Sequence, residues 1–367
     1  MTELPKALRC EMLSQADEPH LQQIYAGFGM LARQGRLHLR QRLAPCDFRR
    51  DDLPPHLDEP GASHLIVLAD GLRIGYDVHD AGEVNAELLD QVDICFKRGW
   101  ESHFVAACAA PERVLPLGAN VWVHDVAPSW FALQRGLLRH GRERLKSWTR
   151  ALGLDRLLGD RMFTPRLGDL EASPPLTLAP RVLFLAEAWN PAEAPSPATA
   201  VERVVINALR ADCMRALRVE FGALATCGFR ATAFAQQEFP DLVVTDTRLT
   251  RKRHYLALVR QHPICIASAG LHRSIGWKFA EYLSMSRAIV SEKLHMRLPG
   301  NFAAGHNYLE FDTAQSCVAA VRSLIDDRAA RERLMRNNHD YYLAHVRPDS
   351  LVAASLVTAI EQGRARR

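Results

Sequence analysis

Short apolar runs alternate with amphipathic stretches along the first half of the chain. Residues 21–33 show helical spacing, and the apolar run at 64–69 is followed by the turn pair Asp70 and Gly71. Short apolar runs are typical of buried strands, whereas helical spacing of apolar positions is typical of amphipathic helices. Further short strands are expected at residues 36–43, 92–96 and 113–117 and from residue 73. Because strands and helices alternate, we expect parallel βαβ units.

The second half of the chain begins after a proline-rich stretch. Residues 173–180 read Ser-Pro-Pro-Leu-Thr-Leu-Ala-Pro. Such a stretch separates domains because proline fixes the backbone without helix or ladder hydrogen bonds. Strands are expected from residue 181 and at 242–245, 264–267 and 288–291, with helices at 201–221, 231–238, 252–260, 274–284 and from 313 onwards. This spacing fits right-handed crossovers in a doubly wound α/β sheet.

Residues 129–158 have a different character. Leu138, Leu145, Trp148 and Leu152 form an amphipathic stripe. The rest of that surface carries the cations Arg135, Arg139, Arg142, Arg144, Lys146 and Arg150, opposed by Glu143. Two interpretations stay open. The segment is either an ordinary surface helix with a solvated basic face, or a basic amphipathic helix that lies on the inner surface of a membrane.

Composition narrows the function classes. The 367 residues carry a net charge of +4, too small to indicate a nucleic-acid partner. The eight cysteines include no Cys-x-x-Cys pair, which favours buried free thiols in a reducing compartment over zinc or disulfide sites. No apolar run reaches the length of a membrane-spanning helix, and the amino terminus lacks an apolar signal core. We therefore expect a cytoplasmic protein without a bound metal.

The most informative segment is residues 264–307. It predicts a strand, a polar glycine-containing turn, a short helix, a second strand and a loop. This order places Ser274, Gly276, Lys278 and Glu281 at a helix N-terminus beyond the carboxyl end of a parallel strand, where open α/β sheets bind nucleotides. The chain contains no Gly-x-Ser-x-Gly, His-Glu-x-x-His, P-loop or Gly-x-Gly-x-x-Gly signature, which excludes the enzyme classes that depend on them.

The stretch Gly270-Leu-His-Arg-Ser-Ile-Gly-Trp-Lys-Phe-Ala-Glu-Tyr resembles the donor-binding loop and helix of GT-B fold glycosyltransferases, particularly bacterial family-1-like and spore-protein-type enzymes. The resemblance is most specific over residues 181–356. It implies two Rossmann-like domains facing a central cleft, residues 1–175 and 181–345, and a final helix, 346–367, that crosses back to the first domain. It also implies a metal-independent enzyme of polysaccharide biosynthesis. This enzyme would move a sugar from a UDP-, GDP- or dTDP-sugar to a glycan, lipid-linked or protein acceptor, without a bound cofactor.

One position departs from the family pattern. Glu281 matches the glutamate that holds the ribose hydroxyls of the donor. Many retaining members carry another glutamate eight positions earlier, where this chain has Arg273. The stereochemical outcome therefore stays open. A nucleotide-sugar 2-epimerase of the same architecture and a non-catalytic glycan-binding relative are the alternatives.

Donor binding requires positive charge near the diphosphate, because negative charge develops on this leaving group. We expect Lys278 to supply such charge, Ser274 to cap the helix and Gly276 to leave backbone N–H groups free for an anion. The expected donor-binding residues are Gly270, His272, Ser274, Gly276, Lys278, Glu281, Arg251 and Lys252.

The first half of the chain is expected to supply the general base. His79 and Asp80 follow a predicted buried strand, at whose carboxyl end side chains emerge, and they are the catalytic candidates. Alternatively, Asp80 caps a helix that begins near Gly82. His103 and His124 are weaker candidates of the same type.

The predicted helix at 201–221 has two different faces. Its apolar stripe consists of Val205, Leu209, Cys213, Leu217 and Phe221. The opposite face carries Arg203, Asn207 and Arg210. We expect the stripe to be buried and the polar face to be solvated, with a position in the cleft as the alternative for the polar residues.

Overall fold

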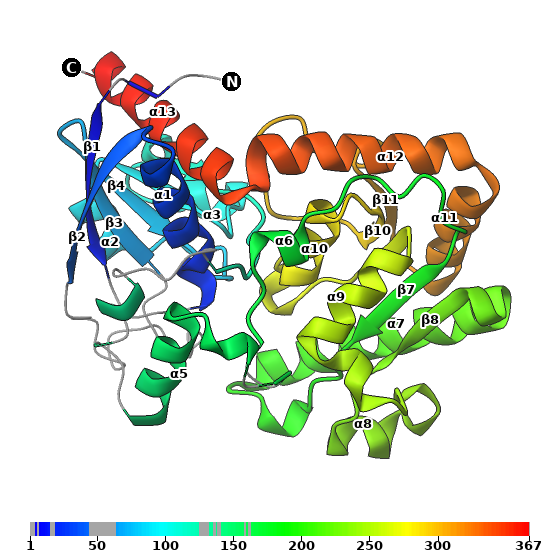
Figure 1. Ribbon diagram of the computed structural model, residues 1–367. Coiled ribbons are helices and arrows are strands. Elements are labelled where there is room, and N and C mark those ends of the chain that lie inside the picture. Colours follow the sequence, from blue (N-terminus) through cyan, green and yellow to red (C-terminus); the bar gives the residue numbers. More distant parts are fainter. Residues whose placement is uncertain are drawn as a thin grey trace. The chain divides into compact units, whose positions relative to one another are not determined.

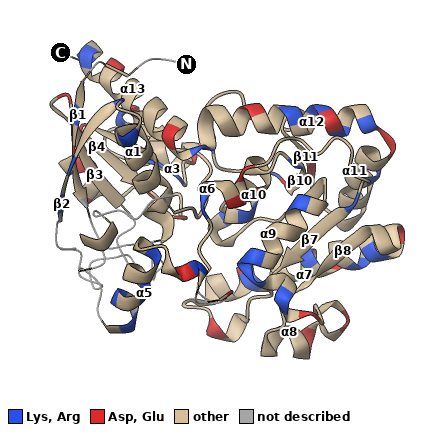
Figure 2. Cartoon of the chain, viewed as in Figure 1, with Lys and Arg blue, Asp and Glu red and all other residues tan. Residues whose placement is uncertain are grey.

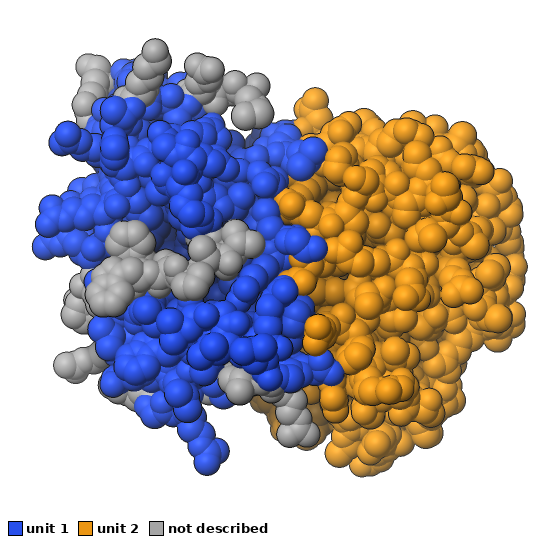
Figure 3. Space-filling model, viewed as in Figure 1, with its two compact units in different colours: residues 1–168, 296–300, 343–367 blue, residues 169–295, 301–342 orange. Residues whose placement is uncertain are grey.

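The chain folds into two compact units. The computed structural model describes residues 4–5, 7–14, 19–43, 64–124, 132–134, 137, 141–157, 159–160 and 163–366. Unit 1 comprises residues 1–168, 296–300 and 343–367, and unit 2 comprises residues 169–295 and 301–342 (Figure 3). Each unit contains its own β-sheet, which confirms the expected α/β class with two sheet-containing domains.

Unit 1 is built on a mixed sheet (Figure 1). Its strand order is β2-β1-β3-β4-β5-β6. Its strands are β1 (Leu8–Ser14), β2 (Leu37–Leu43), β3 (His64–Ala69), β4 (Leu72–Asp77), β5 (Ile94–Lys97) and β6 (Val114–Pro116). Strand β3 runs antiparallel to β1 and β4, so the all-parallel expectation is wrong here. The reason is the Asp70–Gly71 turn. Its positive φ angles of 51° and 75° suit a two-residue hairpin, which joins β3 directly to β4.

Helices cover both faces of the sheet in unit 1. They are α1 (Gln22–Arg33), α2 (Ala86–Gln91), α3 (Ser102–Ala107) and α13 (Pro348–Arg366). Unit 1 also contains α5 (Gly141–Ala151), which contacts the turn at residues 154–156. Helices α1 and α13 pack against each other and share the main core with the sheet, whereas α2 and α3 contribute to a second apolar cluster. The crossing of α1 and α13 is close at Gly27, where a Cβ atom would lie 2.3 Å from the carbonyl oxygen of Pro348. Glycine allows this approach because it lacks a side chain.

Unit 2 is built on a parallel sheet with the strand order β11-β10-β9-β7-β8. Its strands are β7 (Val182–Ala186), β8 (Ala225–Phe229), β9 (Ile264–Ala267), β10 (Ala288–Glu292) and β11 (Tyr308–Phe311). The expected strand at 242–245 is reduced to one parallel bridge between Val243 and Phe229 of β8. With that bridge counted as a strand, the sheet has the 3-2-1-4-5-6 order of the Rossmann fold. Strand β11 was not among the strands expected from the sequence.

Helices also cover both faces of the sheet in unit 2. They are α7 (Pro197–Phe221), α8 (Ala233–Glu238), α9 (Lys252–Gln261), α10 (Trp277–Ser284), α11 (Ala314–Asp326) and α12 (Arg328–Tyr341), and the short α6 (Leu167–Leu170) spans the boundary of the two units. Helices α7, α11 and α12 share a core with Ile264 and Ile266 of β9. Cys265 faces the other side by alternation. There Tyr255 of α9 donates a hydrogen bond to the hydroxyl of Tyr282 in α10 at 2.8 Å. Coverage on both sides explains why every residue of β9 is buried.

The first half of α7 buries a different face from the predicted one. Asn207 and Arg210 are 2% and 5% exposed, whereas the exposed large apolar residues of this half are Val201, Val204 and Val205. Asn207 is buried because its amide satisfies the backbone of Trp189: Oδ1 accepts from the Trp189 N–H at 3.0 Å and Nδ2 donates to the Trp189 carbonyl at 2.7 Å. Further along the helix the prediction is confirmed, since Cys213 and Leu217 are buried.

Candidate functional site

A cavity of about 480 Å³ opens at the carboxyl edge of the sheet in unit 2. Its walls come from the ends of β7, β9 and β10, the loop at 268–276 and the first turn of α10. The lining residues that the structure describes all belong to unit 2. In open α/β sheets this edge is the usual ligand site, because loops and helix N-termini converge there.

The loop after β9 forms a compact turn beside the cavity. The backbone N–H of Gly270 donates to the carbonyl of Ser274 at 2.8 Å. His272 and Arg273 adopt the left-handed conformation, with φ angles of 57° and 55°. This conformation is uncommon for residues other than glycine, and it concentrates at functional sites.

The N-terminus of α10 contributes to the cavity wall. The helix begins at Trp277, and its N-cap Gly276 makes no side-chain cap hydrogen bond. The expectation that Ser274 caps this helix is therefore wrong. Ser274 is buried in the turn at 270–274. It therefore lies two residues before Gly276, the actual N-cap of the helix. The positive end of the helix dipole and the backbone N–H groups of a first turn favour an anion in this position.

The lining of the cavity carries an excess of positive charge. It contains five cations and two carboxylates, which are Arg210, Lys252, Arg273, Lys278, Lys293, Glu187 and Glu292. The indole rings of Trp189 and Trp277 add apolar surface to the same lining. This combination suits a ligand that joins a diphosphate to flat or apolar groups.

Arg210 connects the loops that follow β7 and β9. Its Nη1 donates to the carbonyl of Glu187 at 2.8 Å and its Nη2 to the carbonyl of Ala269 at 2.9 Å. Its Nε donates to Ser268 Oγ at 2.8 Å, and the guanidinium lies 4.3 Å from the centre of the Trp189 ring. Burial lowers the pKa of Arg210 to about 10, so the guanidinium remains charged at neutral pH. It therefore fixes two walls of the cavity and adds a permanent positive charge.

Lys278 is a partly buried lysine in the cavity wall. Its Nζ donates to the carbonyl of Leu185 in β7 and lies 5.2 Å from the centre of the Tyr255 ring. Burial, and after it the charge of Arg210, lower the pKa of Lys278 to about 7. A bound anion favours the charged form of such a lysine, because an opposite charge raises its pKa.

Glu281 and Lys252 form an ion pair between α10 and α9, with Lys252 Nζ on Glu281 Oε1. Lys252 lines the cavity, whereas Glu281 is fully buried and is not a lining residue. The second carboxylate oxygen, Oε2, has no hydrogen-bond partner within the described part of the chain. An unpaired buried acceptor costs about 1–3 kcal/mol, so this oxygen is suited to a hydroxyl donor.

Five of the eight expected donor-binding residues line the cavity: Gly270, Ser274, Gly276, Lys278 and Lys252. Glu281 reaches it through its partner Lys252. Arg251 is the exposed N-cap of α9, and His272 donates its backbone N–H to Glu202 Oε1 at 2.7 Å. Neither of these two residues is in the lining.

Several lining residues were not singled out from the sequence, and Trp189 and Glu292 are two of them. Trp189 follows β7, and Glu292 ends β10. Glu292 Oε1 accepts the backbone N–H of Ala269 at 3.0 Å, and burial raises the pKa of its carboxyl group. Both residues stand at the carboxyl end of a predicted buried strand, and that position was the available signal.

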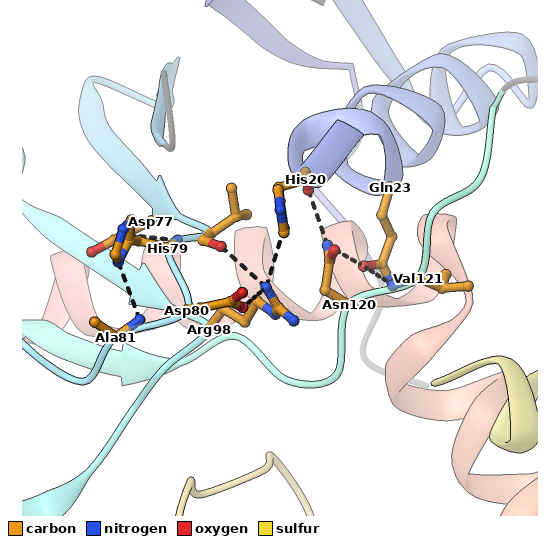
Figure 4. A network of polar contacts seen from close by, with 10 residues as sticks. His20, Gln23, Asp77, His79, Asp80, Ala81, Arg98, Asn120 and Val121 are labelled. Carbon is orange, nitrogen blue, oxygen red and sulfur yellow. Dashed lines mark hydrogen bonds and ion pairs between the residues drawn. The ribbon is translucent and has the colours of Figure 1, made fainter. Parts of the chain in front are cut away.

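A second polar cluster lies at the carboxyl edge of the sheet in unit 1 (Figure 4). Asp77 ends β4 and Lys97 ends β5, and both are almost completely buried. Lys97 Nζ donates to Asp77 Oδ2 at 3.0 Å, while Asp77 Oδ1 accepts the backbone N–H of His79 at 3.0 Å. This buried ion pair anchors the loop that carries His79 and Asp80.

Arg98 connects the predicted candidate Asp80 to His20. The guanidinium pairs with Asp80 Oδ1, and its Nη1 lies 3.2 Å from His20 Nδ1. Burial, followed by the charge of Arg98, lowers the pKa of His20 to about 4, so this ring is neutral at neutral pH. The alternative role of Asp80 as a helix cap is wrong, because Asn85 caps α2.

His79 has its Nδ1 engaged by the backbone. The N–H of Ala81 donates to this nitrogen at 3.1 Å, which places the proton of a neutral ring on Nε2. The structure therefore brings His79, Asp80 and His20 to one edge of the sheet, and His20 is the member that the sequence did not single out. His103 lies on the surface in α3, its Nδ1 3.8 Å from Glu101 Oε2.

Metal ligands or reactive thiols would support other chemistry. Within the described ranges, no group of three or more His, Cys, Asp or Glu residues is arranged to hold a metal ion. Seven cysteines of the described part are free, and all but Cys108 are buried. Cys46 lies outside the described residues.

Comparisons with known proteins give only broad likeness. No protein-family model and no curated protein sequence matches the chain. Similar solved structures include the C-terminal domain of a glycosyl transferase group 1 family protein from Francisella tularensis, at 10% identity and a TM-score of 0.34, covering 48% of this chain and 95% of that one. Another is UDP-GlcNAc 2-epimerase from Neisseria meningitidis bound to UDP-GlcNAc, at 12% identity and a TM-score of 0.38. The match covers 78% of this chain and 68% of that one.

Proposed function

We propose that the cavity of unit 2 binds the nucleoside diphosphate of a sugar donor and that the protein is a glycosyltransferase. The excess of cations at a carboxyl-edge cavity that also receives a helix N-terminus carries this proposal. The departing diphosphate gains negative charge during sugar transfer, and fixed cations and backbone dipoles stabilise that charge. The volume of about 480 Å³ is in the range of small-molecule sites.

The donor-side residues have distinct proposed roles. Lys278 meets the diphosphate, and Arg210 holds the walls in place while adding charge. Glu281 positions Lys252 through Oε1. Glu281 is fully buried, so a ribose hydroxyl would reach its unpaired Oε2 only after the side chains that cover it move aside. The resemblance assigns the same ribose role to Glu281.

The acceptor-side base is proposed to come from the loop that follows β4. Asp80 is a better candidate than His79, because the Nδ1 lone pair of His79 already accepts the N–H of Ala81. A base must lie within hydrogen-bond reach of the hydroxyl that it deprotonates. The side chain of Arg98 fixes the orientation of the Asp80 carboxylate for that task.

Nucleotide binding tests the proposal directly. Full-length protein is titrated with UDP, GDP, dTDP, ADP and CMP by calorimetry and thermal shift. We expect one nucleoside diphosphate to bind, and Lys278→Met to weaken its affinity about tenfold to a hundredfold, because a charge-assisted contact is lost. Arg333→Met removes an exposed cation on α12 and is the matched control, with unchanged affinity expected. Absence of binding by all five nucleotides would refute the proposal.

The products separate transfer from the alternatives. Incubation of the preferred nucleotide-sugar with a cell extract as the source of acceptor should release free nucleoside diphosphate. An epimer formed without acceptor would replace the proposal with a 2-epimerase. Binding without either product would replace it with a non-catalytic glycan-binding protein.

A further inference from the structure

Five leucines are exposed within one segment of unit 1. The segment comprises α5 and its flanking turns, residue 137 and residues 141–157. The exposed fractions are 49% for Leu137, 62% for Leu145, 47% for Leu152, 43% for Leu154 and 80% for Leu157. Such a concentration of apolar surface is typical of an interaction site. We call these five residues the leucine patch.

The exposure of the leucine patch distinguishes between the two interpretations of residues 129–158. An ordinary surface helix turns its apolar stripe toward the core. Here Leu145 and Leu152 of the predicted stripe face outward, whereas Ser147 and Ala151 are buried. Members of the predicted pattern that lie outside the described residues are Arg135, Leu138 and Arg139.

The same segment is strongly basic. Its cations are Arg142, Arg144, Lys146, Arg150 and Arg156, and Figure 2 shows Lys and Arg along α5. Asp155 does not offset this charge at the surface, because it is 1% exposed and its Oδ1 pairs with Arg166 Nη2 at 3.2 Å. Glu143 is the other acid of the segment, and its side chain lies outside the described residues.

We propose that this segment docks unit 1 on an anionic lipid bilayer. The leucines would enter the boundary between headgroups and acyl chains, and the flanking cations would contact the phosphates of anionic lipids. The surface is complementary to such a bilayer in both polarity and charge. A second copy of the chain is a poorer occupant, because it would bring two basic segments together. In the described part of the chain, no helix combines the length and the apolar character needed to cross a bilayer.

Vesicle co-sedimentation of the full-length protein tests this proposal. Vesicles of phosphatidylcholine alone are compared with vesicles containing about one third phosphatidylglycerol. We expect binding at least about tenfold tighter to the anionic vesicles, since each cation near such a surface contributes to binding. That binding should fall as NaCl is raised from about 0.05 M to about 0.5 M, because salt screens the charges.

Two variants separate the apolar contribution from the charge contribution. Leu145→Gln with Leu157→Gln should weaken anionic-vesicle binding about tenfold or more, because it removes apolar contact without changing the net charge. Arg142→Gln with Arg156→Gln should weaken it to a similar extent and flatten its salt dependence. The matched control is Val201→Gln with Val219→Gln, two apolar residues of α7 that are 66% and 88% exposed, and its binding should equal that of the wild type.

Several outcomes would overturn the proposal. These are no binding of the wild type to anionic vesicles at low salt, equal binding to both vesicle types, or full binding by the leucine double variant. Analytical ultracentrifugation without lipid tests whether a second copy of the chain binds the leucine patch. If the protein does not bind vesicles but self-associates, and the leucine substitutions abolish this self-association, the leucine patch would be assigned to a second copy instead.

Discussion

Among single residues, Lys278 has the most pH-sensitive chemistry in the cavity. Burial and the neighbouring charge of Arg210 lower its pKa to about 7, so the free protein holds both protonation states near neutral pH. A bound diphosphate raises that pKa, because an anion stabilises the ammonium form. Donor binding above neutral pH therefore requires the uptake of a proton.

The affinity for a nucleotide-sugar should accordingly fall as pH rises. We expect it to be highest below pH 7 and to weaken about tenfold between about pH 6 and about pH 9, when Lys278 loses its charge in the free protein. Calorimetry with an intact nucleotide-sugar measures this cleanly, because its phosphates are diesters without the second ionisation of a terminal phosphate. The Lys278→Met variant should show a flat profile. A wild-type affinity that is constant or that rises with pH would contradict this role.

The two carboxylate oxygens of Glu281 have different proposed roles, and these roles can be tested separately. We expect Glu281→Gln to weaken nucleoside diphosphate binding about tenfold, through loss of the pair with Lys252 and of the ribose contact. Wild-type protein should prefer the ribonucleotide over its 2′-deoxy analogue, and the variant should lose that preference. Unchanged discrimination in Glu281→Gln would leave Glu281 only its role of positioning Lys252.

Among the elements, the crossing of α1 and α13 is the tightest contact that can be tested without touching the cavity. A Cβ atom at Gly27 would lie 2.3 Å from the Pro348 carbonyl oxygen and 2.5 Å from Val352 Cγ2. Gly27→Ala should destabilise the protein by about 1–3 kcal/mol, because the helices must separate, and this exceeds the gain in helix propensity. Gly168→Ala is the matched control, since a Cβ there meets no atom within 4 Å. Chemical denaturation measures both, and equal stability of the two variants would refute the close packing.

Elements buried on both faces were the ones that the sequence predicted well. Strand β9 has the expected bounds, because a continuous apolar run is the signature of a central parallel strand. The expected strand at 242–245 fell short, since a strand at the edge of a sheet has one neighbour and Val243 forms a single bridge. The strand at 64–69 was expected, but its antiparallel direction was not, because an apolar run does not indicate strand direction. The Asp70–Gly71 turn that follows it did indicate a hairpin.

The sequence predicted some lining residues of the cavity correctly, but it did not predict which polar side chains are buried. Lys278 was expected at the donor site and lines the cavity. Arg210 was expected on a solvated face, yet three hydrogen bonds hold it inside the wall. A side chain that satisfies loop carbonyls cannot be distinguished by spacing from one that faces water, because both interrupt an apolar stripe in the same way.

At the scale of the whole molecule, unit 1 draws on segments from both ends of the sequence. Residues 1–168 supply its sheet, while α13 supplies core residues that include Leu356 and Ile360, which are 0% and 2% exposed. Unit 2 lies between these segments in the sequence and contains the whole described lining of the cavity.

Because of this arrangement, unit 2 can complete its fold during synthesis before unit 1 does. Synthesis usually lets the amino-terminal domain fold first. Here α1 lacks its covering helix until residues 348–366 have left the exit tunnel, by which time unit 2 has already been synthesised. The nascent chain thus holds an uncovered apolar surface while unit 2 completes itself, and that interval is when a holdase chaperone would be needed most.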